Sequence, residues 1–107
     1  MNEDYFNFLN SIYSELLARN YQTVLFGNLE KFSELSNDQY IACCPFHEDN
    51  TRSFSIAADK PVWYCHECKE KGNWIQYIQK KEGLSYKLAL SKLVEAVAIY
   101  TTTTLSA

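Results

Sequence analysis

The sequence predicts a small domain of the α+β class, because helical patterns at both ends enclose a central stretch with strand patterns. A chain of 107 residues has room for one domain. Its hydrophobic content of 47 % and aromatic content of 15 % are typical of globular proteins. No apolar run approaches the roughly 20 residues of a membrane span, and the acidic first residues do not resemble a secretory signal. We therefore expect a soluble, cytoplasmic protein.

The N-terminal part predicts one long helix. Apolar residues recur at helical spacing over residues 4–19, and Asp4 is the expected N-cap. We expect the apolar face of this helix to pack on the rest of the domain, because a small domain needs that hydrophobic area. Residues 21–35 have a mixed pattern with a break near Gly27, and no element is assigned to them.

The central part predicts three short strands. They cover residues 39–43, 53–57 and 62–65, and turn-forming residues stand at 36–38, 48–50 and 59–61.

Two helices are predicted after the strands. Asn73 caps the first, over residues 74–81, and Gly83 ends it. Ser85 caps the second, over residues 86–99. The polar end is expected to be a flexible tail or the start of a linker, so the predicted domain covers residues 1–100 and the tail residues 101–107.

Four potential metal ligands lie in the central part as two short pairs. Cys44-x-x-His47 is followed, after seventeen residues, by Cys65-x-x-Cys68. Each pair is able to wrap one side of a metal, and the span between them is long enough for a β-hairpin. Three thiolates and one imidazole fill all four positions of tetrahedral Zn²⁺ and leave none for an activated water. We therefore predict one structural zinc and no catalytic site within these residues.

Other chemistries fit the cysteines less well. Two disulfides would leave a histidine at ligand spacing unexplained, and a chain that is not exported keeps its thiols reduced. A thioredoxin-like motif at residues 65–68 lacks the surrounding βαβ pattern, and a deaminase zinc site needs a His-x-Glu element that is absent here. Cys43 competes with Cys44 as a ligand, but strand alternation points it the opposite way.

Basic and aromatic residues gather around the second ligand pair. Residues 51–107 carry eight bases and five acids, whereas residues 1–50 carry two bases and eight acids. Single-strand binding proteins use basic groups to follow phosphates and aromatic faces to stack bases. We expect Tyr64 or Trp74 to be buried. Strand alternation places Trp63 on the face opposite to Tyr64, so we expect Trp63 to be exposed. His66 is also expected to be exposed. The candidate nucleic-acid contacts are Arg52, Lys60, Trp63, His66, Lys69 and Lys71.

The residues around the ligands resemble a known family. They read Tyr-Ile-Ala-Cys-Cys-Pro-Phe-His over residues 40–47, then Thr51-x-Ser53-Phe54, Cys65-x-x-Cys68 and Gly72-Asn73. This pattern resembles the N-terminal zinc-binding domain of bacterial DnaG-type DNA primases, and the resemblance covers most of the chain. It implies a zinc ribbon in which an antiparallel sheet of about five strands is flanked by helices.

The resemblance also implies a function in DNA replication. In that family the domain contacts the single-stranded DNA template, helps to select the initiation site, and presents template and nucleotides to a separate polymerase domain. The expected partners are therefore single-stranded DNA, a primase polymerase domain in cis or in trans, and the replicative helicase of the primosome, with no membrane. Arg52, Lys69 and Lys71 stand where the family often has proline or small residues, which makes these loops more basic. The alternative is a stand-alone regulatory or protein-interaction zinc ribbon that docks a helicase or polymerase.

Overall fold

The computed structural model describes residues 3–35, 39–48 and 51–106, with the backbone alone described for 101–106. Helices stand at both ends of the chain and five strands lie between them, as the α+β prediction requires. In chain order the elements are α1 Glu3–Ala18, α2 Gln22–Leu25, β1 Ser33–Leu35, β2 Gln39–Ala42, β3 Phe54–Ala57, β4 Val62–Cys65, β5 Lys71–Asn73, α3 Trp74–Glu82 and α4 Tyr86–Ser106.

The five strands form one antiparallel sheet in the order β1-β2-β3-β4-β5, so each strand pairs with its neighbour along the chain. Burial alternates along β2, β3 and β4, which gives the sheet one buried and one partly exposed face. The buried face carries Tyr40, Ala42, Phe54, Ile56, Trp63 and Cys65. The three predicted strands are confirmed, whereas β1 and β5 were not assigned from their residues.

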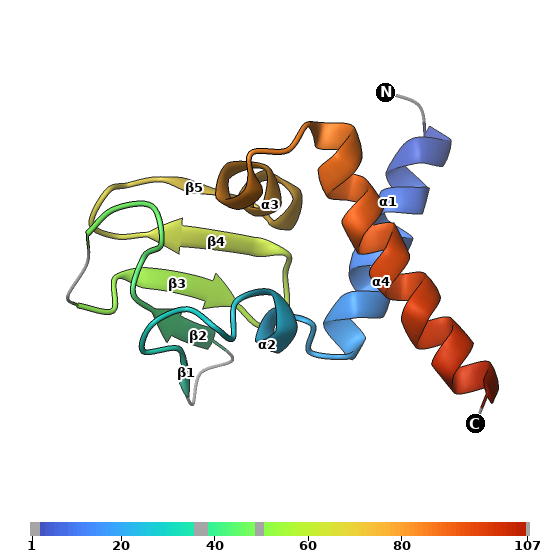
Figure 1. Cartoon of the computed structure of the whole chain (residues 1–107), viewed down its shortest axis with the longest axis horizontal. Helices are drawn as coiled ribbons and strands as arrows, with labels where there is room; N and C mark the ends of the chain where they lie inside the picture. The colour runs from blue at the N-terminus through green and yellow to red at the C-terminus, as the bar shows by residue number, and fades with distance from the viewer. Residues whose placement is uncertain (1–2, 36–38, 49–50, 107) are drawn as a thin grey trace.

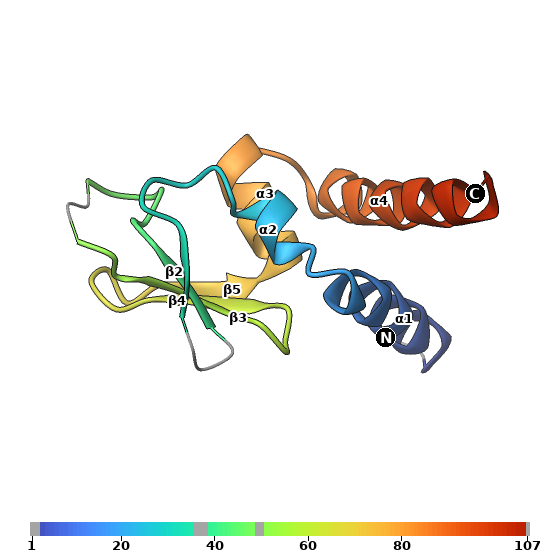
Figure 2. The same cartoon turned by 90° about the horizontal axis from the view of Figure 1, so that it is seen from below.

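The helices that the structure describes cover one face of the sheet (Figure 2). Figure 2 shows α2 and α3 above the strands, with no helix below them. The buried face packs on α3 residues such as Ile75 and Ile78, which are almost fully buried. Gln22 of α2 is fully buried, and its Nε2 donates hydrogen bonds to the carbonyl oxygens of Ala57 and Ala58. These bonds fix α2 to the turn between β3 and β4.

Helices α1 and α4 cross each other beside the sheet, and in Figure 1 both run from the top of the picture toward the bottom. Tyr5 and Tyr86, near the starts of the two helices, are hydrogen-bonded through their hydroxyl groups. Near the ends, the guanidinium carbon of Arg19 lies 4.9 Å from the centre of the Tyr100 ring. The predicted packing of the N-terminal helix is confirmed for Ile12, Tyr13 and Leu16, which are buried, whereas Phe6 and Phe8 remain exposed.

The predicted helix caps differ in outcome. Asn73 caps α3: its side chain accepts from the backbone N–H of Gln76, and the Gln76 side chain accepts from the backbone N–H of Asn73. Gly83 ends α3 in the left-handed conformation with φ of 67°, as predicted. Asp4 is not an N-cap, because α1 begins at Glu3 and Asp4 lies in its first turn, where an acid still complements the helix dipole. The turns predicted at 36–38 and around residues 49 and 50 lie outside the described residues.

The C-terminal helix is longer than the predicted residues 86–99. Helix α4 continues to Ser106, so residues 101–106 are helical rather than irregular. Four threonines cost at most about 0.7 kcal/mol of helix propensity each, and no glycine or proline interrupts the segment. Extension of an existing helix is easier than nucleation, which explains why weak helix formers follow the packed part of α4. Ala107 lies outside the described residues.

Candidate metal centre and nucleic-acid interface

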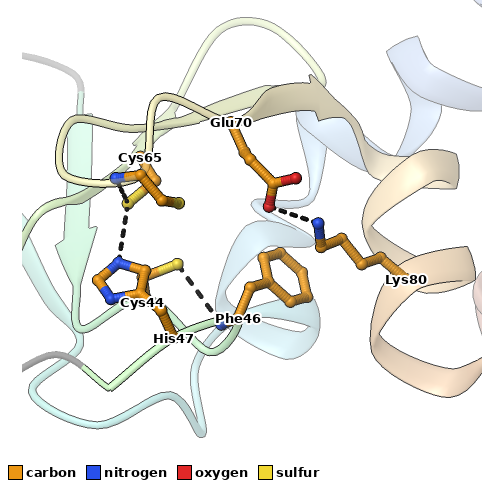
Figure 3. Close-up of polar contacts among 7 residues, drawn as sticks. Cys44, Phe46, His47, Cys65, Glu70 and Lys80 are labelled. Atoms are coloured by element: carbon orange, nitrogen blue, oxygen red, sulfur yellow. Dashed lines mark hydrogen bonds and ion pairs between the residues drawn. The ribbon is translucent and has the colours of Figure 1, made fainter.

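The four predicted ligands meet at one end of the sheet. Cys44 and His47 follow β2, while Cys65 ends β4 and Cys68 lies in the turn after it. Their ligand atoms all lie within 4.8 Å of one another. Sulfur atoms bound at about 2.3 Å to one tetrahedral zinc lie roughly 3.8 Å apart, so the cluster needs little adjustment to bind the ion. Figure 3 shows the side chains of Cys44 and His47 turned toward Cys65.

Hydrogen bonds around the cluster fix the orientation of its members. Nδ1 of His47 donates to the carbonyl oxygen of Glu48 at 2.9 Å, so Nε2 is the nitrogen that binds the metal once it has lost its proton. This Nε2 lies 3.3 Å from the sulfur of Cys65. The backbone N–H groups of Phe46 and Cys68 approach the sulfurs of Cys44 and Cys65, each at 3.5 Å. Such contacts stabilise thiolates, which are the form that binds zinc.

The protein environment alone, without a metal, gives the thiols of Cys44 and Cys65 different pKa values. Burial raises the pKa of Cys44 to about 12, against the opposing effect of the Phe46 N–H. Burial also acts to raise the pKa of Cys65, but hydrogen bonds from the Cys68 N–H and from His47, Cys68 and Ser53 together lower it to about 6. Cys65 is therefore the readier thiolate, and binding of zinc by Cys44 releases a proton at neutral pH.

A second group of side chains connects both ligand loops to α3. The ring of Phe46 lies between the ligands and the helix, with the ammonium group of Lys80 4.9 Å from its centre. Lys80 also forms an ion pair with Glu70, which follows the second ligand pair (Figure 3). Both charged groups are more than a third exposed, so this contact orients the loops more than it stabilises the fold.

Cys43 is buried but does not belong to the ligand group found among the described residues. Its backbone N–H donates to the carbonyl oxygen of Glu30, which ties the start of the first ligand loop to the segment before β1. Among the described residues, the sulfur of Cys44 and not that of Cys43 therefore lies with the other three predicted ligands.

The uncovered face of the sheet carries a continuous row of side chains. The register pairs Ser33 with Ile41, Ile41 with Ser55, Ser55 with Tyr64, and Tyr64 with Lys71. A neighbouring row contains Leu35, Gln39, Ala57, Val62 and Asn73. We call the surface made by these two rows the open face. Neither row contains an acidic residue, although the whole chain has a net charge of −3.

Three of the predicted nucleic-acid contacts adjoin the open face. Nη1 of Arg52 donates to the Ser33 hydroxyl at 3.1 Å, at the β1 edge. His66 is exposed, as predicted, and its Nε2 lies 2.9 Å from the Ser55 hydroxyl in the middle of the row. Lys71 belongs to the row itself, in the edge strand β5. Side chains that lie far apart in the sequence therefore converge on one surface.

The two remaining lysines are placed differently. Lys69 is exposed in the second ligand loop, and its backbone has φ of 62°, a conformation that costs glycine less than lysine. Lys60 lies in the turn between β3 and β4, at the end of the sheet opposite to the ligands. Lys60 is thus separated from the other candidates.

Comparison with known proteins identifies the family. The sequence model of the CHC2 zinc finger family matches residues 9–106, which is most of the chain. The chain belongs to the CHC2 zinc finger family. This membership and the geometry of the four ligands show that it is a zinc ribbon with one structural zinc.

The relatives of this CHC2 zinc finger are DNA primases. DNA primase of Mycoplasma genitalium is 38 % identical over 66 residues, which cover 62 % of this chain and 11 % of that protein. DNA primase of Helicobacter pylori is 43 % identical over 58 residues, which cover 54 % of this chain and 10 % of that protein. The chain therefore spans about a tenth of the length of these primases.

A solved structure supports the same relationship. The Aquifex aeolicus primase, described by its zinc-binding and RNA polymerase domains, matches with a TM-score of 0.63 and 27 % sequence identity. The match covers 77 % of this chain and 20 % of that chain. The predicted resemblance to the zinc-binding domain of DNA primases is confirmed. Among the described helices, none is long and apolar enough to cross a membrane.

The exposure predicted for Trp63 is wrong. Trp63 is only 4 % exposed, and its ring stacks on Phe54 at a centroid distance of 5.2 Å. Its indole Nε1 donates to the carbonyl oxygen of Asn73 at 2.9 Å, which helps to hold β5. Side chains alternate along β4, so Trp63 shares the face of Cys65, which must point to the metal and the core. A buried indole cannot stack on a base, and Trp63 is removed from the candidate contacts.

Tyr64 is the aromatic residue that the sequence analysis missed. It lies on the open face, is only partly buried, and meets the His66 ring edge-to-face at a centroid distance of 4.7 Å. The alternation of side chains along β4 could have predicted this position. Because Cys65 points to the metal as a ligand, Val62 and Tyr64 must lie on the opposite face of the sheet. Trp74, in contrast, is fully buried, as predicted.

Proposed function

We propose that this CHC2 zinc finger binds single-stranded template DNA on its open face and assists a primase polymerase domain in starting primers. The observation that carries the proposal is a row across a face that no described helix covers: His66 and Lys71 lie beside Tyr64, and Arg52 stands at the β1 end of the row. Cationic groups attract phosphates, and a partly exposed aromatic ring offers a surface for base stacking. Polar hydroxyl groups of Ser33 and Ser55 orient two of these side chains.

The charge distribution supports this choice of surface. Phosphates repel carboxylates, and the two rows of the open face contain none. Three of the acids of residues 1–50, Glu3, Asp4 and Glu15, belong to α1 instead. A net acidic domain that offers one acid-free surface should bind weakly, in a salt-dependent manner.

The partner for the chemical step is a primase polymerase domain, in the same chain or in another one. The relatives are DNA primases, and the matched Aquifex structure contains an RNA polymerase domain besides its zinc-binding domain. This favours a primase module over a stand-alone regulatory zinc ribbon. Contact with the replicative helicase and action in the cytoplasm remain predictions.

The test is a binding titration with the zinc-loaded protein and a labelled single-stranded oligonucleotide of mixed sequence at low salt. The double substitution Arg52→Ala with Lys71→Ala should weaken binding at least tenfold. It should also lower the slope of log K against log salt by about 1.4, since each lost phosphate contact removes about 0.7.

The matched control removes two other exposed lysines, Lys81→Ala with Lys87→Ala, from α3 and α4. This control should weaken oligonucleotide binding less than the double substitution of Arg52 and Lys71 does. If the control weakens binding equally, or if no oligonucleotide binds, the open face is not the template site.

A further inference from the structure

A hollow of about 580 Å³ opens over β4 and β5, at the edge of the open face. Its size lies within the roughly 300–1,000 Å³ that is typical of ligand pockets. Val62 and Tyr64 line it from β4, and Lys71 and Asn73 from β5. Gln76, from the first turn of α3, completes the lining. Apolar walls with a few polar groups are the usual composition of a site for a small planar ligand.

The capping box of α3 decides which polar atoms remain for a ligand. Oδ1 of Asn73 accepts from the backbone N–H of Gln76, and Oε1 of Gln76 accepts from the backbone N–H of Asn73, each at 2.8 Å. Because backbone N–H groups only donate, these bonds also fix which amide atom is oxygen. Each amide oxygen thus already accepts one hydrogen bond, and the NH₂ group of each side chain remains as a donor without a partner among the described residues.

The other polar groups of the hollow add to this excess of donors. The ammonium group of Lys71 is donor-only. Within the part of the chain that the structure describes, no side chain or backbone group is recorded as accepting from Lys71 Nζ, Asn73 Nδ2 or Gln76 Nε2. A ligand that presents acceptors therefore fits this rim well.

We propose that the hollow holds one unstacked nucleobase of the bound strand and favours bases that present carbonyl oxygens to its donors. This inference rests on the proposed function and assigns a subsite to it. Tyr64 and Val62 supply the apolar contact for the ring, and the two amide NH₂ groups bind the keto oxygen. Thymine, guanine and cytosine offer a keto oxygen to these donors, whereas adenine offers only ring nitrogens and places an amino donor at the 6-position, which repels the donors of the hollow.

The test compares two oligonucleotides that differ only at the N1 and C6 positions of a single purine: one has a 6-keto group and N1–H, the other a 6-amino group and an unprotonated N1. Each oligonucleotide carries one central base flanked by abasic sites. The base is hypoxanthine in one strand and adenine in the other, so both strands carry a purine of the same size. The zinc-loaded protein should bind the hypoxanthine strand about fivefold more tightly, the factor expected for one neutral hydrogen bond. Asn73→Ser and Gln76→Glu should each bring the two affinities close together. Both variants keep the capping box, because serine is a good N-cap and glutamate a good box partner.

Gln39→Glu is the matched control for the charge that Gln76→Glu introduces. It replaces a glutamine by a glutamate on the open face, away from the hollow. It should weaken both strands equally and keep their ratio. Equal affinity of the unmodified protein for both strands, or a ratio that survives in both hollow variants, would overturn the base subsite and leave the proposed function intact. Failure of both strands and of a mixed-sequence strand to bind would overturn the proposed function itself.

Discussion

Removal of zinc with a strong chelator should unfold the sheet of this domain, and Cys65→Ser should have the same effect without a chelator. Structural zinc contributes on the order of 10–16 kcal/mol in zinc-finger peptides, whereas small domains have net stabilities of about 5–15 kcal/mol. The loops that carry the ligands join β2 to β3 and β4 to β5, so their release frees four of the five strands.

The measurement is tryptophan fluorescence with circular dichroism during chelation and after zinc is restored. Both tryptophans are buried, so both should report the loss of the core. Cys43→Ser is the control, because Cys43 lies outside the ligand group, and it should retain one zinc per chain. A domain that keeps its circular dichroism and fluorescence without metal would show that its core alone supports the fold.

Substitution of Trp63 and of its neighbour Tyr64 should have opposite consequences. Trp63→Ala removes a side chain that contacts Phe46, Phe54 and Tyr77 in the core, and should cost about 3–5 kcal/mol of unfolding free energy. Tyr64→Ala should cost much less stability. It should weaken single-strand binding by about 1–3 kcal/mol, which is the contribution of one stacked base.

Denaturant unfolding and oligonucleotide titration of the two variants separate these effects. The stability of Trp63→Ala is compared with that of Tyr64→Ala under saturating zinc, and binding is measured only where the variant is folded. Normal binding by Tyr64→Ala would exclude this ring as a stacking surface. Normal stability of Trp63→Ala would contradict its place in the core.

The metal centre could be predicted from the sequence because its information is local. Two short ligand pairs define the site, and strand alternation next to Cys44 is enough to exclude Cys43. The caps of α3 are local in the same way, since Asn73 and Gly83 act within one turn of the helix. The burial of Trp63 was also within reach, because the metal fixes the direction of Cys65 and hence of every second residue in β4.

Other features depend on contacts between distant segments. The three-residue strands β1 and β5 have too few residues for a pattern, and they form because β2 and β4 offer them edges. The register across the sheet places Arg52 beside Ser33 and leaves Lys60 at the far end, which no local pattern indicates. Helix α4 packs on Tyr21 through Tyr100, and its continuation to Ser106 elongates this packed helix although threonine is a weak helix former.

Mapping of a bound strand by nuclear magnetic resonance tests the central claim, that a zinc-supported sheet binds template on its uncovered face. The zinc-loaded, isotopically labelled protein is titrated with a short unlabelled single-stranded oligonucleotide at low salt. We predict that the largest amide shifts fall on Ser55, Tyr64, Lys71 and the adjoining Arg52 and His66, with α1 and α4 unchanged. Shifts confined to α1 and α4, or no shifts at all, would contradict it.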